Sequence, residues 1–519
     1  MPKDTFYLTT PIYYVNDVPH LGHAYTTVAA DALARWRRLL GERVFFLTGT
    51  DEHGQKIMRT AQSNGMGPRE WTDTVVPRWH EVWQLLDISH DDFIRTTEPR
   101  HTLRVQEFVQ RLYEQGDIYK GSYRGPYCVS CEEFKEPGEL LEGQLCPIHE
   151  RAVDLVEEDN YFFRLSDYRE ALLSLYDERP EFVRPEARLN EVRAFVAGGL
   201  KDLSLSRSSF DWGVPVPWDP SHVIYVWIDA LQNYITAAGF GADPQLFERL
   251  WPADVHFVGK DILRFHAVIW PAMLIAAGID PPRTVWAHGW LMVGGKKMSK
   301  TAITGIHPRD LVATFGSDAL RYYLLRDISF GQDGNFSWEA LHERYTTDLG
   351  NDLGNLVNRV LNMAASYLGG VAPEPRTDTS EAGAQLATDR KAALDGVEAA
   401  MEQLDYRSAL ESAWVLVRGA NRYVDATAPW ALHKAGHGEE LAAVMYTLLD
   451  TLRGISVLLS FVLPSTAGRM WKHLGLEGRP EQQVVPGGLE PGLLPPGAVV
   501  EKGPVLFPRV ETSEDAAAR

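Results

Sequence analysis

Hydrophobic and polar positions follow two periods in the N-terminal part of the chain, and together they predict a strand, a helix and a second strand. Thr5–Val15 is rich in aromatic and β-branched residues, which predicts a strand that ends near Pro11. Apolar residues then recur at helical spacing over Ala24–Leu40, with Asp17 as the expected N-cap. Arg43–Thr48 is strand-like again. This order is typical of a βαβ unit with a parallel sheet, in which ligands bind beyond the carboxyl ends of the strands.

The same pattern returns later in the chain, after a segment of different character. Strand-like runs occur at Val223–Val226, Val255–Val258 and Thr284–Trp286, each followed by a helical or glycine-bearing stretch. The intervening residues 118–222 hold every cysteine and end in a proline-rich exit. We therefore expect an insertion that splits the α/β domain.

The C-terminal part predicts a helix bundle and a strap. Residues 338–476 repeat Leu, Val and Ala at the spacing of packed helices, and the frequent prolines of 480–508 predict an extended segment. The predicted fold class is α/β: a parallel-sheet Rossmann-like domain split by an insertion and followed by an α-helix bundle. The expected segments are 1–117 and 223–293 for the two halves of the α/β domain, 118–222 for the insertion, 294–337 for a lysine-bearing connection, 338–476 for the bundle, and 477–519 for the strap and tail.

Composition removes several classes of protein. The chain has 519 residues, of which 45% are hydrophobic and 23% charged, so disorder, collagen and coiled coils are excluded. Its 51 basic and 70 acidic residues give a net charge of −19, which excludes a uniformly basic nucleic-acid coat. The apolar run Phe265–Ile279 is broken by Pro271 and is shorter than the roughly 20 residues of a membrane span. With no leader-like N-terminus, we expect a cytoplasmic protein.

Two histidines stand where the first strand gives way to the first helix, in His20-Leu21-Gly22-His23. Two imidazoles and the positive end of a helix then meet at one point, which suits an anion. Gly22 removes a side chain where a nucleotide must approach closely. The alternative is that one histidine caps the helix while the other packs on the sheet.

A second cationic motif, Lys297-Met298-Ser299-Lys300-Thr301, follows Gly294-Gly295-Lys296. Ammonium groups on long side chains can follow the negative charge that develops on a leaving pyrophosphate. For an isolated lysine cluster, the alternative is a solvated basic loop.

All three cysteines share one short segment, in which Cys128 and Cys131 are followed by Cys146 and His149. Four nitrogen and sulfur ligands at this spacing fill a tetrahedral Zn²⁺ shell and leave no open position. The spacing therefore predicts one structural zinc ion per chain, against the alternative of three unligated thiols.

The histidine and lysine motifs, in this order, resemble the signatures of class I aminoacyl-tRNA synthetases, and over nearly its whole length the chain is similar to the methionyl-tRNA synthetase family. The segment after Thr301 departs from the Gly-Asn pair usual in that family. The blocks that carry the resemblance are 11–16 (PIYYVN), 48–54 (TGTDEHG), 225–230 (YVWIDA), 259–262 (GKDI), 351–359 (NDLGNLVNR), 421–425 (NRYVD) and 428–430 (APW).

The resemblance implies an enzyme that activates methionine with ATP, releases pyrophosphate, and transfers methionine to the 3′-terminal ribose of initiator and elongator methionine tRNAs. Mg²⁺ is expected with ATP. The implied catalytic residues are His20, His23, Lys297 and Lys300; the implied ATP-binding residues are His20, Gly22, His23, Gly259, Asp261, Lys297, Met298, Ser299 and Lys300.

The resemblance also implies a methionine pocket and an anticodon site. An apolar, polarizable thioether suits aromatic walls with a hydroxyl or an imidazole; without the resemblance, the helical stripe that begins at Trp227 would be only core. The implied methionine-binding residues are Ile12, Tyr14, Asp51, Trp227, Ala230, Leu231, Tyr234, Ile262 and His266, and the implied anticodon-binding residues are Asn355, Arg359, Pro429 and Trp430.

Two other functions stay open at this point. A leucyl, isoleucyl or valyl relative shares both signatures but normally carries a far larger editing insertion than 118–222. A non-catalytic RNA-binding paralogue would be expected to lose signature histidines or lysines, and all are present. Longer relatives append a C-terminal barrel through which they dimerise, so we expect a monomer.

Overall fold

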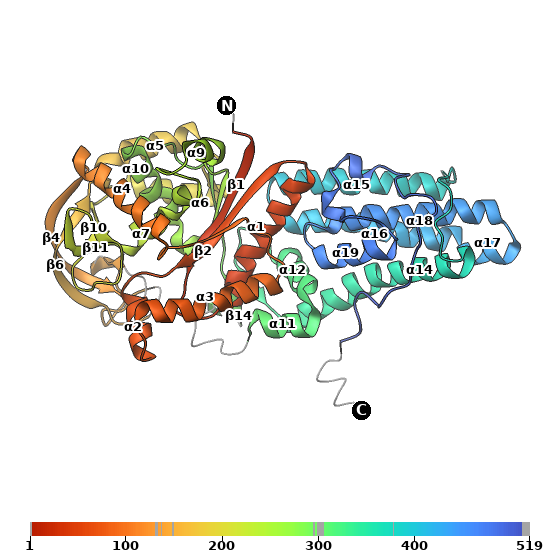
Figure 1. The fold of residues 1–519 in the computed structure, drawn as a ribbon, viewed down its shortest axis with the longest axis horizontal. Helices are drawn as coiled ribbons and strands as arrows, with labels where there is room; N and C mark the ends of the chain where they lie inside the picture. The colour runs from red at the N-terminus through yellow and green to blue at the C-terminus, as the bar shows by residue number, and fades with distance from the viewer. Residues whose placement is uncertain are drawn as a thin grey trace. The chain divides into compact units, whose positions relative to one another are not determined.

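The computed structural model describes residues 3–129, 133–135, 137–147, 150–293, 296–297, 306–376 and 378–510 (Figure 1). Two compact units emerge from the contacts within the chain. The first comprises Met1–Pro19, Val44–Glu81 and His90–His288, and the second His20–Arg43, Val82–Ser89 and Gly289–Arg519.

The first unit is built on a six-stranded sheet with the strand order β3-β2-β1-β12-β13-β7. β1 pairs in parallel with β12, β12 with β13, β13 with β7, and β2 with β3. The chain moves from β1 to β2 on one side and later returns to β12 on the other. The switch point of the topology therefore lies between β1 and β12, where sheets of this kind bind ligands. The strands are β1 (Thr5–Tyr14), β2 (Arg43–Asp51), β3 (Asp92–Arg95), β7 (Val183–Arg184), β12 (Val255–Gly259) and β13 (Thr284–His288).

The central strands are buried on both faces, as parallel strands covered by helices are. Tyr7 and Leu8 of β1 and Phe257 of β12 are fully buried. The helices of this unit are α2 (Gln55–Ser63), α3 (Pro68–Leu85, its last turn in the second unit), α4 (Pro99–Gln115), α5 (Arg169–Glu178), α6 (Glu186–Ala197), α7 (Val226–Leu231), α8 (Asn233–Ala237), α9 (Pro244–Leu250) and α10 (Trp270–Ala276).

Residues 118–222 do not form one separate layer. An antiparallel sheet of β5, β4, β6 and β8 occupies part of this range, but β7 lies within the range and extends the main sheet. Short strands of this kind carry too few residues to show a period, so the sequence pattern missed β7. The added strands are β4 (Ile118–Cys128), β5 (Glu133–Phe134), β6 (Asp154–Phe163) and β8 (Leu203–Ser204).

The strand predicted over Val223–Val226 is confirmed for Val223 and Ile224, but it does not belong to the main sheet. The strand is β11 (Asp219–Ile224), and it pairs antiparallel with β9 (Ser206–Arg207) and β10 (Pro215–Val216) in a small sheet. The chain is already helical at Val226. A short apolar run shows that a segment is buried but not which partner strand covers it, because that partner is distant in the sequence.

The second unit contains α1 and a helix bundle, in which the long helices α15, α16 and α18 run side by side (Figure 1). Helix α18 is long and apolar enough to cross a membrane, but 83% of its apolar stretch is buried in the bundle, so it is a core helix. The helices are α1 (Leu21–Leu39), α11 (Pro308–Phe315), α12 (Ser317–Arg326), α13 (Trp338–Arg344), α14 (Asn355–Leu368), α15 (Glu381–Glu402), α16 (Tyr406–Thr427), α17 (Pro429–Ala435), α18 (Gly438–Leu459) and α19 (Pro464–His473), with a π-helical turn at Tyr345–Gly354.

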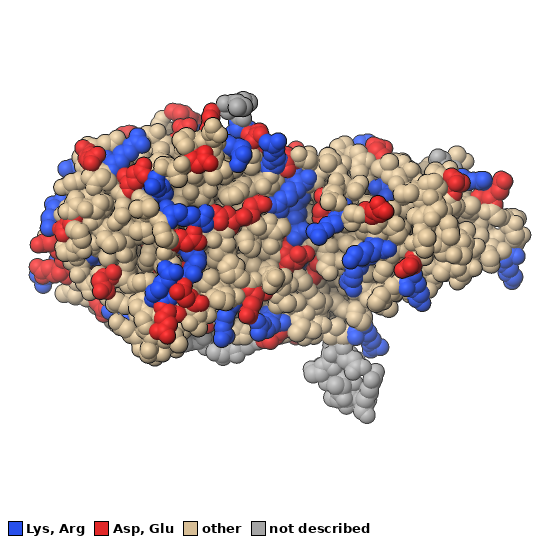
Figure 2. All heavy atoms as spheres, viewed as in Figure 1, with Lys and Arg blue, Asp and Glu red and all other residues tan. Residues whose placement is uncertain are grey.

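The proline-rich segment 480–508 lies along the bundle and is held by buried polar groups. Arg453 donates to the carbonyl oxygens of Gly488 and Glu490, both at 2.7 Å. The carboxylate of Asp450 accepts from the backbone N–H of Leu494 at 3.1 Å. On the face seen in Figure 2, acidic and basic side chains are interspersed, in keeping with a chain whose negative charge is spread along its length.

Candidate functional site

The two histidines of the first motif form the N-terminal cap of α1. Nδ1 of His20 accepts from the N–H of Gly22 at 3.0 Å, and Nδ1 of His23 accepts from the N–H of His20 at 3.2 Å. Their rings stack with centroids 3.6 Å apart. Because both Nδ1 atoms are acceptors, each neutral ring carries its proton on Nε2. The cap thus holds two imidazole N–H donors at the positive end of a helix, an arrangement suited to a polyphosphate.

The prediction that Asp17 is the N-cap of the first helix was wrong, because His20 caps α1. Its carboxylate accepts from the neighbouring N–H of Val18 at 2.8 Å, so it closes a local turn before the helix instead of capping it. The structure gives a reason for Gly22 within the protein itself: a Cβ at this position would lie 2.9 Å from Cε1 of His20. The glycine therefore gives the ring of His20 room to fold over the first turn.

The lysine motif is described only in part. The backbone of Lys296 and Lys297 forms β15, which pairs antiparallel with β14 (Leu291–Val293), and β14 pairs in parallel with β16 (Gly334–Phe336). Met298, Ser299 and Lys300 lie outside the described residues. The role of the lysines therefore stays a prediction.

Most residues predicted to bind methionine meet in one apolar cluster of the first unit. Leu231 and Tyr234 are buried in this cluster, and Ile12, Tyr14, Trp227 and Ile262 pack against it half-buried. The ring of Trp227 stacks on Phe265 with centroids 4.0 Å apart and an interplanar angle of 11°. Chain segments that are far apart in the sequence thus bring apolar and aromatic side chains into one cluster, and such side chains contact a thioether favourably.

The expected helical stripe from Trp227 to Tyr234 is interrupted. Helix α7 ends at Leu231 and α8 begins at Asn233, so Tyr234 does not continue the face of Trp227 on a single helix. Ala230 is buried in α7, and its carbonyl accepts from the side chain of Asn233 at 2.6 Å. Tyr234 is nevertheless buried in the cluster, where its hydroxyl hydrogen-bonds to His266.

His266 lies in a π-helical turn at Phe265–Ile269. Its Nδ1 lies 3.0 Å from the carbonyl oxygen of Ile262, and its Nε2 lies 2.8 Å from the hydroxyl of Tyr234. A carbonyl only accepts, so Nδ1 carries the proton and Nε2 accepts from Tyr234. Burial lowers the pKa of His266 to about 4, which keeps the ring neutral.

Asp51, the candidate for the substrate ammonium, ends β2 and is 3% exposed. Its carbonyl accepts from the N–H of Val15 at 3.4 Å, so the end of β2 lies beside the end of β1, where Tyr14 stands. Gly259 ends β12, and a Cβ there would lie 2.6 Å from a carboxylate oxygen of Asp261. Asp261 itself is exposed, as a group that contacts a ligand can be.

The predicted zinc ligands are also described only in part. Cys128 ends β4, and both Cys128 and Cys146 are buried and not in a disulfide. The backbone turns back on itself after Cys146, whose N–H donates to Arg151 and whose carbonyl accepts from Glu150, both at 2.8 Å. Cys131 and His149 lie outside the described residues, and no metal-ligating cluster forms among the residues that are described.

The predicted anticodon residues lie on two helices of the bundle. Asn355 and Arg359 stand one turn apart on α14, where Asn355 is exposed. Pro429 is buried at the start of α17, and the next residue, Trp430, is 46% exposed. An aromatic ring so exposed beside a rigid helix start is available for stacking.

Sequence reasoning missed a partner of this set. Asp425 on α16 accepts from Arg359 at 2.8 Å, in an ion pair whose two side chains are 41% and 67% exposed. The sequence offered one clue, because Asp425 closes one of the blocks that carry the family resemblance, the segment 421–425.

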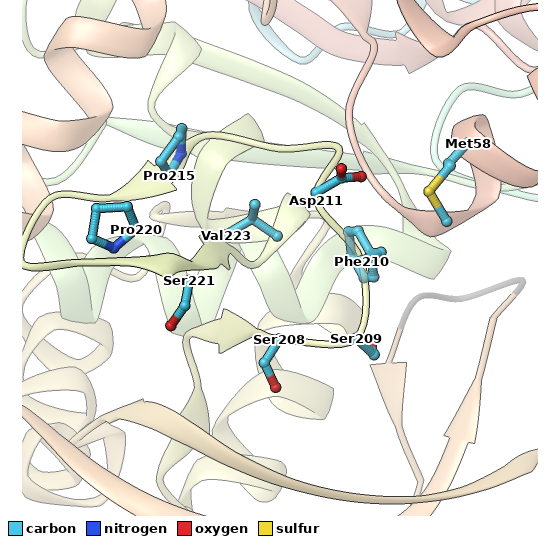
Figure 3. A pocket seen from close by; sticks show the side chains of 9 residues that line it. All are labelled: Met58, Ser208, Ser209, Phe210, Asp211, Pro215, Pro220, Ser221 and Val223. Atoms are coloured by element: carbon cyan, nitrogen blue, oxygen red, sulfur yellow. The ribbon is translucent and has the colours of Figure 1, made fainter.

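A cavity of about 440 Å³ lies elsewhere in the first unit (Figure 3). Met58 of α2 lines it together with residues around the small β9–β10–β11 sheet, among them Phe210 and Asp211. None of its lining residues belongs to the predicted methionine or ATP sets. This cavity therefore does not coincide with the predicted site, and the chemistry of the clustered side chains is the better guide.

Comparisons with known proteins show the family to which the chain belongs. A family model described as tRNA synthetases class I (M) matches residues 6–152 and 135–361, and one described as the anticodon binding domain of methionyl tRNA ligase matches residues 373–518. The methionine–tRNA ligase of Streptomyces coelicolor is 54% identical, over 98% of this chain and 97% of that protein. That of Caldanaerobacter subterraneus is 49% identical, over 99% of this chain and 80% of that protein.

A solved structure is similar along the whole chain. Mycobacterium tuberculosis methionyl-tRNA synthetase, in complex with methionyl-adenylate, superposes with a TM-score of 0.92 at 42% identity and covers 98% of this chain and 100% of that one. The parallel sheet with its histidine motif is that of a class I aminoacyl-tRNA synthetase. Within this class, the chain belongs to the methionyl-tRNA synthetase family, the methionine–tRNA ligases. The family resemblance is confirmed, and so is the predicted fold class of a parallel-sheet α/β domain followed by a helical domain; the zinc knuckle expected in the insertion stays a prediction.

Proposed function

We propose that the reaction of this family, activation of methionine by ATP and its transfer to tRNA, is carried out in this chain by the residues described above. The methionine carboxylate attacks the α-phosphorus of ATP, and pyrophosphate leaves. A hydroxyl of the terminal ribose of tRNA then attacks the adenylate carbonyl, and AMP leaves. The observation that carries the assignment is the neutral Tyr234–His266 pair within an apolar cluster.

The histidines and lysines are proposed to stabilise the phosphates. Nε2–H of His20 and of His23 can donate to phosphate oxygens, because their Nδ1 atoms are already engaged in the cap. Lys297 and Lys300 are proposed to follow the charge onto the leaving pyrophosphate. Mg²⁺ would accompany ATP and neutralise part of its charge.

The methionine side chain is proposed to lie against the cluster of Trp227, Leu231 and Tyr234. A thioether sulfur is a weak acceptor and contacts aromatic rings favourably, so this surface selects it through shape and polarizability. Asp51 is the proposed partner of the substrate ammonium, since it places a carboxylate at the end of a strand beside Tyr14.

Further parts of the assignment are proposals on the same footing. The substrate RNAs are proposed to be initiator and elongator methionine tRNAs, with Asn355, Arg359, Pro429 and Trp430 in contact with the anticodon. One zinc ion is proposed to be held by Cys128, Cys131, Cys146 and His149; the two described thiols are buried side chains of the soft type that zinc prefers. The chain is proposed to act as a cytoplasmic monomer.

Methionine-dependent ATP–pyrophosphate exchange, measured together with tRNA charging, tests these roles. His20→Ala, His23→Ala, Lys297→Ala and Lys300→Ala should each lower the exchange rate roughly 10²-fold, the scale of losing one transition-state donor. Matched controls are His437→Ala and Lys391→Ala, which remove side chains 60% and 76% exposed in the bundle and should leave the rate unchanged. Changes below about threefold at all four sites would refute the roles.

A further inference from the structure

A carboxylate near the methionine cluster is fully buried between two imidazoles. Asp229 of α7 is 0% exposed, and its two oxygens are used separately. Oδ2 lies 2.6 Å from Nδ1 of His53, and Oδ1 lies 2.8 Å from Nε2 of His101. Since a carboxylate only accepts, both imidazole nitrogens must donate.

The charge on this carboxylate is maintained by its partners. Burial alone would raise the pKa of Asp229, but the charges and hydrogen bonds of His53 and His101 outweigh it and lower the pKa to about 2. Asp229 is therefore ionised at neutral pH. A buried ion of this kind is costly unless its partners are held in place, so the three side chains form a rigid group.

The cluster joins three elements that the sequence separates. His53 directly follows Asp51 and Glu52 at the end of β2, and His101 lies in the first turns of α4. Asp229 stands two residues after Trp227 and immediately before Ala230 on α7. Two residues proposed for the methionine site, Asp51 and Trp227, thus each lie two residues along the chain from a member of this buried hydrogen-bonded group, His53 and Asp229.

The two imidazole rings differ in what holds them: His53 also contacts Trp212, whereas the only hydrogen bond of the His101 side chain among the described residues is to Asp229. The His53 ring meets Trp212 edge to face with centroids 5.4 Å apart, and Trp212 donates to the carbonyl of Glu52 at 2.6 Å. His101 is fully buried, and its Nδ1 has no hydrogen-bond partner among the described residues. Asp229 is therefore the one polar anchor of the His101 ring within the described part of the chain.

We propose that Asp229 is a positioning residue for methionine recognition, which fixes α7 against the ends of β2 and α4 and so sets the distance between Trp227 and Asp51. It does not touch the substrate; it acts through the residues that do. This inference rests on the proposed methionine pocket, and it adds a residue that keeps Trp227 and Asp51 at a fixed distance from each other. A displacement of about 1 Å in such a wall is enough to weaken productive binding strongly.

Kinetics of methionine-dependent exchange test the proposal. Asp229→Asn keeps the shape of the side chain but removes its charge and one acceptor, and His101→Leu removes the donor of one link. Both should raise the KM for methionine about tenfold and leave the KM for ATP within about twofold. His101→Gln, whose amide can place an N–H near the former Nε2, should restore most of the affinity for methionine.

Two controls separate positioning from stability. Asp450→Asn removes a buried carboxylate of similar exposure, 2%, that bridges arginines in the bundle, and it should lower the melting temperature without changing the KM for methionine. In the double variant Trp227→Ala/Asp229→Asn, the KM should rise by less than the product of the two single effects, because Asp229 acts through Trp227.

The outcomes distinguish this inference from the proposed pocket. If Asp229→Asn and His101→Leu lower only the melting temperature, and the KM for methionine stays within about twofold, the cluster is purely structural and the inference is overturned. If Trp227→Ala also leaves the KM for methionine unchanged, the proposed pocket itself fails. A raised KM for methionine with Trp227→Ala alone retains the pocket and removes the role of Asp229.

Discussion

Tyr234 donates its hydroxyl hydrogen to Nε2 of His266 across 2.8 Å, and the direction of this bond is set from the far side of the imidazole, where Nδ1 donates to the carbonyl of Ile262. The ring can hold both bonds only while it is neutral. A protonated His266 would present an N–H to the Tyr234 hydroxyl in place of a lone pair and would carry an uncompensated charge into an apolar cluster.

The first prediction concerns how stability depends on pH. Burial lowers the folded-state pKa of His266 to about 4, against an ordinary value of 6.5. Above about pH 6.5 both folded and unfolded chains are neutral at this residue, so its contribution is fully present. Between about pH 6.5 and 4 the unfolded chain takes up a proton that the folded chain refuses, and about 3 kcal/mol of stability is lost.

Urea unfolding followed at several pH values checks this. The free energy of unfolding of the wild type should fall more steeply below about pH 6.5 than that of His266→Gln, which cannot titrate there. Groups that do not interact with His266 are common to both proteins and cancel in the difference. The buried His256 does not cancel, because burial and then His266 lower its pKa. Parallel curves for the two proteins would contradict a buried neutral His266.

The sequence predicted residue types for this site but not their pairing. Tyr234 and His266 were both selected, yet their hydrogen bond depends on a π-helical turn and on a helix that restarts at Asn233, and neither leaves a periodic trace. The sequence analysis also missed the role proposed for Asp229. Its neighbours His53 and His101 are distant in sequence, so no spacing rule connects them.

The extent of β1 shows why the strand limits were uncertain. A proline was expected to end the strand, but β1 runs on through Pro11 to Tyr14. Its pairing with β12 covers Leu8 and Thr9 only, so Pro11, which lacks an N–H, lies beyond the residues paired with that neighbour. A rule based only on neighbouring residues in the sequence cannot predict where β1 ends, because the register is set by the partner strand.

The second prediction concerns Arg321, which joins helices of the second unit. Its guanidinium is fully buried, pairs with Asp31 of α1 at 2.7 Å, and donates to the carbonyls of Leu86, Phe461 and Val462. Burial by itself would raise the pKa of Asp31, but Arg35 and Arg321 hold it well below its usual range. Arg321→Met should therefore cost about 3 to 5 kcal/mol, because Asp31 keeps only Arg35 as an arginine partner and three carbonyl oxygens lose their buried donor.

Chemical denaturation of the variant measures that cost. Arg418→Met is the matched control, since Arg418 is 42% exposed and pairs with the half-exposed Glu411; its loss should cost about 0 to 1 kcal/mol. Equal effects of the two substitutions would show that the buried pair adds nothing to the second unit.

The third prediction concerns the metal. Protein washed with a chelator should retain one zinc ion per chain by elemental analysis, because a closed site of thiolates and an imidazole binds zinc tightly. Cys128→Ser and Cys146→Ser should each release the ion and loosen the β4–β6 sheet, on which Cys128 lies. Exchange should then suffer less than tRNA charging. Washed wild-type protein without zinc would refute the proposed site.

The last prediction concerns anticodon reading, where stacking and packing can be told apart. Trp430 is 46% exposed directly after the buried Pro429, in the first turn of α17. If its ring stacks on an anticodon base, Trp430→Ala removes about 1 to 3 kcal/mol of binding, and charging of methionine tRNA should fall roughly 10- to 100-fold. Pyrophosphate exchange needs no anticodon and should stay unchanged.

Trp338→Ala supplies the control, because Trp338 is a tryptophan of almost equal exposure, 45%, that packs on Phe315 and Phe336. It should affect stability but not charging. Arg359→Ala should in addition weaken discrimination against tRNAs with other anticodons, since it removes a half-exposed guanidinium whose N–H groups can donate to base edges. If Trp430→Ala slows exchange as much as charging, or lowers the melting temperature as Trp338→Ala does while charging is unchanged, its ring packs within the protein and the anticodon is read elsewhere.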